Sequence, residues 1–133
     1  MNTPATNTDS YHWDMEAIDQ IIKSFFGLFT TVGNRQPDWE IMSSICIPEV
    51  LTIKKNGSEE TVYDLQTFIE PRRRLLANGM LTEFKEGELQ EATRIISNLA
   101  QRTSRYQKCG YLNGQYFKEY GSKCFQIICL TQG

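Results

Sequence analysis

Apolar side chains recur at three- and four-residue steps near the start of the chain, with charged and amide side chains between them. The apolar positions are Met15, Ile18, Ile21, Ile22, Phe25, Phe26 and Phe29. This period is that of an amphipathic helix. We expect the helix to begin between Ser10 and Asp14, either of which can cap it. The β-branched pair Thr30 and Thr31, followed by Gly33, marks its end.

A second, shorter helix and a hairpin are predicted next. The helix lies between Pro37 and Pro48, because proline suits the first turn of a helix and cannot continue one. Residues 50–54 and 61–63 are β-prone, and Asn56-Gly57 between them tolerates the positive φ angles of a tight turn. The middle of the chain is therefore helix followed by hairpin.

The pattern predicts a third helix that begins at Asp64 as its cap and ends at Asn78-Gly79. Its apolar stripe consists of Leu65, Phe68, Ile69, Leu75 and Leu76. Pro71 removes a backbone donor from the helix interior, so we expect a bend near Glu70. Arg72 lies within the apolar stripe, where a charged side chain is unexpected.

From residue 81 onward the helical period is lost and long β-prone stretches follow. They cover residues 81–96, 98–107 and 120–130. Gly110 and Asn113-Gly114 mark the last connection, and Gly87 predicts a bulge that curves the sheet. We therefore expect an α+β fold with a flexible N-terminus over residues 1–10 and one domain over residues 11–133.

Composition narrows the class of protein. The chain has 133 residues, 40% of them hydrophobic, and a formal charge of -2. The one basic cluster, Arg72 to Arg74, is too short to follow a phosphate backbone, so no nucleic-acid partner is expected. No apolar stretch reaches the roughly 20 residues that span a bilayer. The polar N-terminus lacks the features of a signal peptide, which predicts a cytoplasmic protein without a membrane partner.

The side chains that bind metals do not form a site in this sequence. The four cysteines include no CxxC pair, and His12 is the only histidine. We expect no metal and no cofactor. His12 is interpreted as a surface or packing residue, and Asp38 and Asp64 as helix caps.

Alternation along the strands brings polar groups to one face. Arg102, Ser104 and Tyr106 share a strand face, and Gln126 lies on a face of the next strand with Ser122. If these faces line a cavity, the side chains can hydrogen-bond a small ligand. The alternative is polar pairing across strands on a solvent-exposed face.

Arg72 and Glu88 are the remaining candidates. Arg72 is either a cation that faces a ligand or a structural partner of a strand carboxylate such as Glu88, since a buried guanidinium must be paired. The structural pairing is the favoured interpretation. A carboxylate in an apolar cavity can also acquire a raised pKa and act as a general base, although the acidic run Glu83, Glu86, Glu88 and Glu91 is by itself typical of a solvent-exposed surface.

The order of elements resembles that of the nuclear transport factor 2-like (SnoaL-like) superfamily. Locally, FKEGELQEATRIISNLAQRTSRY over residues 84–106 is similar to paired strands of that family, with Glu88 on one strand and an Asn-x-Ala-x-x-x-Ser-x-Tyr stretch from Asn98 to Tyr106 on the next. Ile69-Glu70-Pro71-Arg72 resembles the end of its third helix. The resemblance implies a cystatin-like cone of helices on a strongly curved antiparallel sheet. It also implies a final strand, which is missing before Gly133.

Three functions are compatible with this fold, which hosts many unrelated activities. The leading hypothesis is a domain that binds a small hydrophobic or amphipathic molecule, with ligand-binding residues Arg72, Glu88, Arg102, Ser104, Tyr106 and Gln126. The second is an isomerase, dehydratase or cyclase, with Glu88 as general base and Tyr106 as donor to a developing oxyanion. The third is a homodimerisation module, suggested by the unpaired last strand and by large apolar faces. A homodimer is expected with either of the first two as well.

Overall fold

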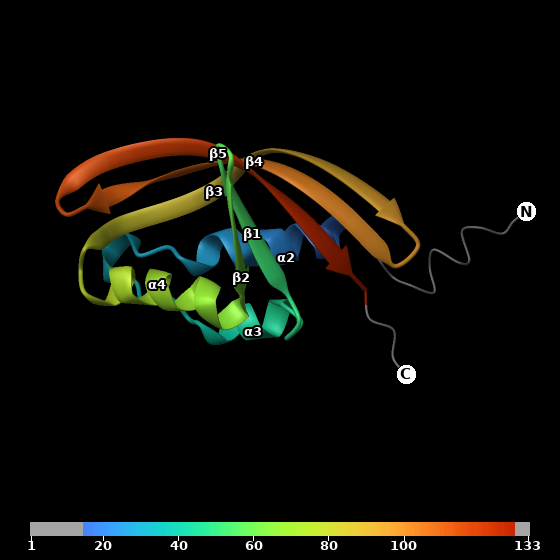
Figure 1. Ribbon diagram of the computed structural model, residues 1–133, viewed down its shortest axis with the longest axis horizontal. Helices are drawn as coiled ribbons and strands as arrows, with labels where there is room; N and C mark the ends of the chain where they lie inside the picture. Colours follow the sequence, from blue (N-terminus) through green and yellow to red (C-terminus); the bar gives the residue numbers. More distant parts are fainter. Residues whose placement is uncertain (1–14, 130–133) are drawn as a thin grey trace, which may run out of the picture.

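The computed structural model describes residues 15–129, with backbone only for residues 55 and 56. Its elements are α2 (Met15–Leu28), the 3-10 helix η1 (Val32–Asn34), α3 (Glu40–Ile45), β1 (Leu51–Asn56), β2 (Glu59–Asp64), α4 (Leu65–Ala77), β3 (Leu81–Ile96), β4 (Leu99–Leu112) and β5 (Gln115–Ile128). Three long strands arch over α2 and α4, and the β1–β2 hairpin stands in front of them in this view (Figure 1). The predicted flexible segment 1–10, His12 and the predicted start of the first helix lie outside the described residues.

The long strands form an antiparallel sheet in the order β3-β4-β5. The turn between β4 and β5 is Asn113-Gly114, with φ angles of 51° and 81°, as a two-residue hairpin turn of this type requires. Gly110, predicted as part of this connection, lies inside β4 instead. A Cβ atom there would stand 3.1 Å from the Cα of Phe84, so glycine permits a close strand contact. As a result β4 and β5 are both longer towards this turn than the sequence suggested.

Two register irregularities curve the sheet. The pairing of β3 with β4 shifts between Thr82 and Lys85 and again between Glu88 and Gln90. A bulge was predicted at Gly87, but Gly87 itself pairs regularly with Gln107. The two irregularities lie on either side of it. Bulges increase the local twist and bend of a strand, which explains the arched shape in Figure 1.

The hairpin and α4 follow the local signals of the sequence. Gly57 has a φ of 67° in the β1–β2 turn, and the Asp64 carboxylate accepts a hydrogen bond from the Thr67 amide at 2.8 Å. The predicted cap is therefore confirmed. α4 runs as one helix from residue 65 to residue 77 and includes the exposed Pro71, so the bend expected near Glu70 stays a prediction.

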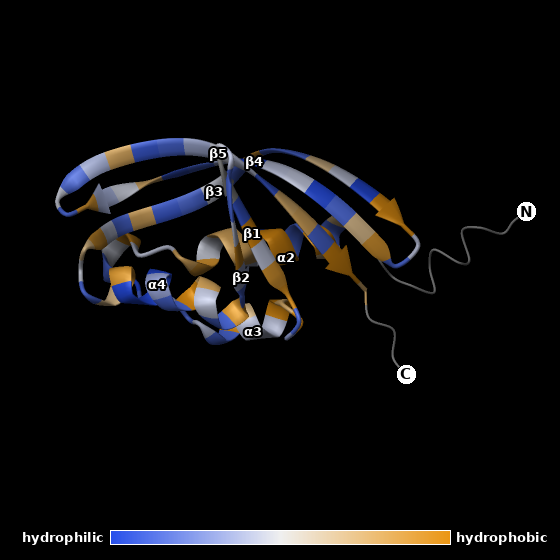
Figure 2. Cartoon of the chain, viewed as in Figure 1, coloured by the Kyte–Doolittle hydropathy of each residue, from blue (hydrophilic) through white to orange (hydrophobic). Residues whose placement is uncertain are grey.

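Two apolar clusters join the helices to the long sheet. One lies between α2 and the β4–β5 pair, and its buried members are Ile18, Ile22, Phe26, Ala100 and Ile127. The other connects the end of α2 with α3, α4 and β3, and its buried members are Leu28, Phe29, Met42, Phe68, Ile69, Leu76 and Phe84. Figure 2 shows apolar residues on α2 and at the ends of the long strands, with polar residues along their middle.

The α+β class predicted from the sequence is confirmed, with helices and two antiparallel sheets. The described strands form no closed barrel, and the cystatin-like cone stays a prediction. Within residues 15–129, β5 pairs with β4 on one side and has no strand on its other side. Over the same residues, no helix has the length and apolar composition that crossing a membrane requires.

Candidate functional site

The inner face of the long sheet, the face towards α2, carries a buried network centred on Arg102. Its guanidinium binds both carboxylate oxygens of Glu88 on β3, one of them from Nε at 3.0 Å. Nη1 donates to Asp19 on α2 at 2.6 Å. The hydroxyl of Ser104 also donates to Glu88. We call Asp19, Glu88, Arg102 and Ser104 the Arg102 cluster.

The alternation of β4 explains why this arginine is buried. Arg102 and Ser104 are 3% and 0% exposed, whereas their neighbours Gln101 and Thr103 are exposed on the outer face. A guanidinium that is removed from water is stable only if its donors are used, and here two carboxylates accept them. The bidentate contact to Glu88 also fixes the geometry of the pair.

Glu88 is held in its charged form by this environment. Burial acts to raise the pKa of Glu88, but the hydrogen bonds from Arg102 and Ser104 and the charge of Arg102 outweigh it. The pKa therefore lies below its ordinary value. The same contacts raise the pKa of Arg102. A carboxylate with a lowered pKa and three protein donors is a poor general base, so the arrangement indicates a structural role for Glu88.

A second group of polar side chains lies further along the inner face, and we call it the Lys123 cluster: Arg72, Glu86, Tyr106 and Lys123. The Lys123 ammonium is 3.6 Å from the Glu86 carboxylate and 4.4 Å from the centre of the Tyr106 ring. Burial lowers the pKa of Lys123, and repulsion from Lys108 and Arg72 acts in the same direction, while Glu86 opposes it. These four side chains come from α4 and from all three long strands.

Tyr106 is positioned by the glycine opposite it. Gly121 is its cross-strand partner, and a Cβ atom on this glycine would lie 2.5 Å from the Tyr106 hydroxyl oxygen. The ring therefore covers the glycine and remains half-buried between Phe26 and Lys123. Burial raises the pKa of Tyr106, with Glu86 and Glu119 adding to the effect, so its hydroxyl remains a hydrogen-bond donor at neutral pH.

Arg72 does not pair with Glu88, which was the favoured interpretation of its place in an apolar stripe. Its guanidinium carbon lies 3.7 Å from the centre of the Phe68 ring and 6.0 Å from that of Tyr63. Nη1 donates to the backbone oxygen of Phe68 at 2.7 Å. Aromatic faces attract a guanidinium, which accounts for an arginine in this stripe without an ion pair.

Gln126 lies apart from the other predicted site residues. It pairs with Gln101 on the outer face of the sheet and is exposed, whereas Phe125 and Ile127 point inward. The structure thus brings together Glu88, Arg102 and Ser104, places Tyr106 in the neighbouring cluster with Arg72, and leaves Gln126 outside both. The sequence does not give the register of β4 against β5, and this register places Gln126 on the outer face.

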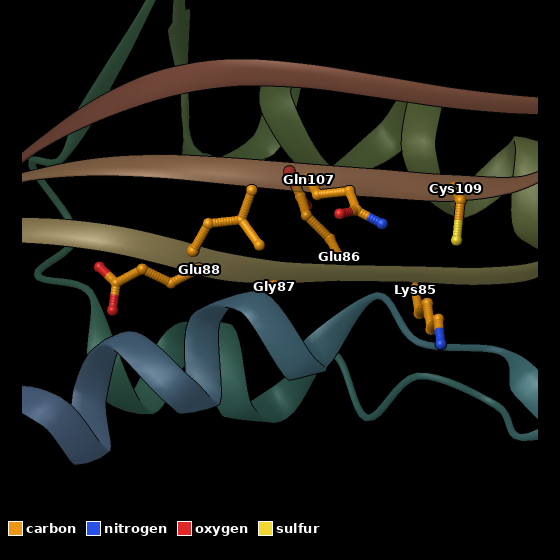
Figure 3. A pocket seen from close by; sticks show the side chains of 7 residues that line it. Lys85, Glu86, Gly87, Glu88, Gln107 and Cys109 are labelled. Carbon is orange, nitrogen blue, oxygen red and sulfur yellow. The ribbon is translucent and has the colours of Figure 1, made fainter.

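A shallow depression also lies on the sheet next to Gly87, with a volume of about 210 Å³. It is lined by Lys85, Glu86, Gly87, Glu88, Leu89, Gln107 and Cys109. Figure 3 shows the labelled Gln107 and Cys109 of β4 beside the β3 segment that carries Lys85. Its two carboxylates are in ion pairs, Glu86 with Lys123 and Glu88 with Arg102. We take the Lys123 cluster as the candidate site because its polar side chains come from four elements and lie on the partly buried inner face.

Three participants were not found from the sequence, namely Asp19, Glu86 and Lys123. Glu86 lies within a run of acidic residues that suggested a wet surface, yet its side chain is 8% exposed. Lys123 alternates with Gly121 and Phe125, and this pattern was the available signal that it faces inward. Asp19 is one of the charged side chains between the apolar positions of α2, and it meets Arg102.

Comparisons of the chain with models of protein families, with curated proteins and with solved structures give no match. The resemblance to the nuclear transport factor 2-like superfamily therefore stays a prediction from sequence motifs. Among residues 15–129, no group of three or more His, Cys, Asp or Glu side chains is arranged to hold a metal ion.

Replacement of Arg102 by methionine tests the Arg102 cluster. The variant keeps much of the side-chain volume but leaves the Glu88 carboxylate without its cation, and we expect the free energy of unfolding to fall by roughly 3 kcal/mol at pH 7. Urea denaturation followed by circular dichroism measures it. Arg94→Met, an exposed position on β3, is the matched control and should change stability by about 0.5 kcal/mol or less. Equal effects at both positions would contradict a special role for Arg102.

The lowered pKa of Glu88 predicts a pH dependence of stability. Between the folded pKa and the ordinary value of about 4.3, the unfolded chain binds more protons than the folded one, so stability rises with pH there. The contribution of Glu88 is complete above that window and is lost as the pH falls through the folded pKa. We expect the difference in unfolding free energy between wild type and Glu88→Gln to be largest near pH 7 and to shrink in acid. A difference that grows in acid would refute the assignment.

Proposed function

We propose that this chain is a small-molecule-binding domain whose site is the Lys123 cluster on the inner face of the long sheet. The observation that carries the proposal is the convergence of Arg72, Glu86, Tyr106 and Lys123, from four different elements, on one partly buried region. Polar groups that are positioned by rigid strands and partly withheld from water are typical of ligand sites. Shifted pKa values also occur there, at Arg72, Tyr106 and Lys123.

The surroundings of the cluster suit an amphipathic ligand. Phe68 of α4 contacts Arg72 and lies 6.2 Å from the Tyr63 ring, measured between ring centres. Phe84 and Phe117 form a further aromatic pair between β3 and β5, with centres 6.4 Å apart. An apolar portion of a ligand can pack on the partly exposed rings of these pairs, Tyr63 and Phe117, while its polar groups bind the charged side chains.

Binding is favoured over catalysis by the state of Glu88. The enzyme hypothesis needs an available base, and this carboxylate accepts from Arg102 and Ser104. Tyr106 retains the donor role that the hypothesis gave it, but a donor alone serves recognition as well as chemistry. We therefore put forward recognition of a ligand, with the Arg102 cluster as the rigid support of the sheet beside it.

The homodimerisation hypothesis receives less support from the outer face. Ile96, Leu99 and Ile128 are neighbours across the three strands and are 60%, 50% and 42% exposed, which is a small apolar patch. Arg94 and Arg105 are exposed on the same face. Two copies that packed these faces together would bring these arginines close to each other, and the repulsion between their positive charges costs free energy.

The proposal predicts where neutral aromatic probes bind. We expect indole, phenol and 4-hydroxybenzamide, titrated into ¹⁵N-labelled protein, to shift the backbone amide resonances of Tyr106, Gly121 and Lys123. Lys123→Ala removes a donor and should weaken the binding of 4-hydroxybenzamide about 2- to 10-fold. The control, Gln126→Ala, changes the outer face of the same strand and should leave the affinity unchanged.

Two results would refute the proposed function. One is an absence of shifts at the inner face with every neutral probe and every aromatic acid tested. The other is shifts that are confined to the outer face of the sheet.

A further inference from the structure

One cation of the Lys123 cluster has no ion-pair partner. Lys123 is 3.6 Å from Glu86, and Lys108 is 3.6 Å from Glu119, so these four groups form two ion pairs. Arg72 differs from them. Within residues 15–129 no carboxylate lies within ion-pair distance of its guanidinium.

The Arg72 side chain is held in place without that carboxylate. It lies over the Phe68 ring at 3.7 Å, and Nη1 donates to the Phe68 backbone oxygen at 2.7 Å. This is the one hydrogen bond that the guanidinium forms with the described residues, although it has five N–H donors. The Phe68 ring therefore orients the planar guanidinium of Arg72, and most of its N–H donors remain available.

A half-buried guanidinium with available donors attracts an anion. Burial lowers the pKa of Arg72, and the more distant Tyr63 and Glu86 oppose this only in part. The free-energy cost of holding a desolvated cation is relieved when a negative group binds it. A carboxylate matches the planar fork of arginine with two parallel hydrogen bonds.

We propose that the ligand of this domain is a monoanionic carboxylate on an aromatic or other apolar body, and that Arg72 binds the carboxylate. This inference rests on the proposed function and names the chemical class of its ligand. A single guanidinium without an ion-pair partner matches a single carboxylate. The partly exposed ring of Tyr63 beside Arg72 supplies a surface for the apolar body, whereas Phe68 is buried beneath the guanidinium.

The test compares acids with their uncharged amides. The probes are benzoate, phenylacetate and 3-phenylpropanoate, each paired with its primary amide, and binding to the full chain is measured by NMR titration at pH 7. We expect at least one acid to bind about tenfold more tightly than its amide, the usual difference between a charged and a neutral hydrogen-bonded pair. This comparison needs no variant and so does not depend on the folding of a mutant.

Variants on α4 then assign the effect to one side chain. Arg72→Gln should abolish the preference for acid over amide, so that both bind with the affinity of the amide. Arg74→Gln removes an exposed cation from the same helix and should preserve the preference. Phenethyl phosphate serves as a dianionic probe, and we expect it to bind no more tightly than the best acid.

The outcomes separate the two proposals. If amides and acids bind the inner face equally, or if Arg72→Gln keeps the preference, the ligand class is wrong and the binding function stands. If phenethyl phosphate binds more tightly than every acid, the monoanion assignment is overturned. If no neutral or charged probe shifts the inner face, the binding function itself fails.

Discussion

The burial of the Arg102 guanidinium is the constraint on which the rest of the structure depends. A fully desolvated cation requires partners from both sides, and it receives Glu88 from the neighbouring strand and Asp19 from the helix that covers the sheet. This fixes the register of β3 against β4 and the position of α2 on their inner face. The second bulge of β3 occurs directly after Glu88, so the irregular strand and the ion pair belong to the same arrangement.

The sequence predicted the elements whose causes are local. The period of α2, the Asp64 cap and the Asn113-Gly114 turn depend on neighbouring residues, and the structure confirms each of them. The partner of Glu88 could not be predicted in the same way, because it depends on which faces of two strands meet. Glu88 meets Arg102 and not Arg72, because β3 and β4 pair in a register that puts Glu88 and Arg102 on the same face.

Register also explains the difference between net charge and local charge. The long strands place Glu86, Glu88 and Glu91 on the inner face, whereas Arg94 and Arg105 are exposed on the outer one. A formal charge of -2 for the whole chain therefore conceals two faces of different character. The inner face holds acidic groups in ion pairs, whereas Arg72 has no ion-pair partner within residues 15–129. This residue, and not the net charge of the chain, bears on recognition.

The meander order of the long sheet has a consequence for how the chain folds. Arg102 and Glu88 are 14 residues apart and belong to one hairpin, whereas Asp19 is 83 residues from Arg102. Contacts of short sequence separation close at a smaller entropic cost and form sooner. The contact between α2 and Arg102 therefore closes a much longer loop than the hairpin contact does, at a larger entropic cost. The same contact also dehydrates the ion pair, so the covering of one buried charge links the first helix of the chain to its last hairpin.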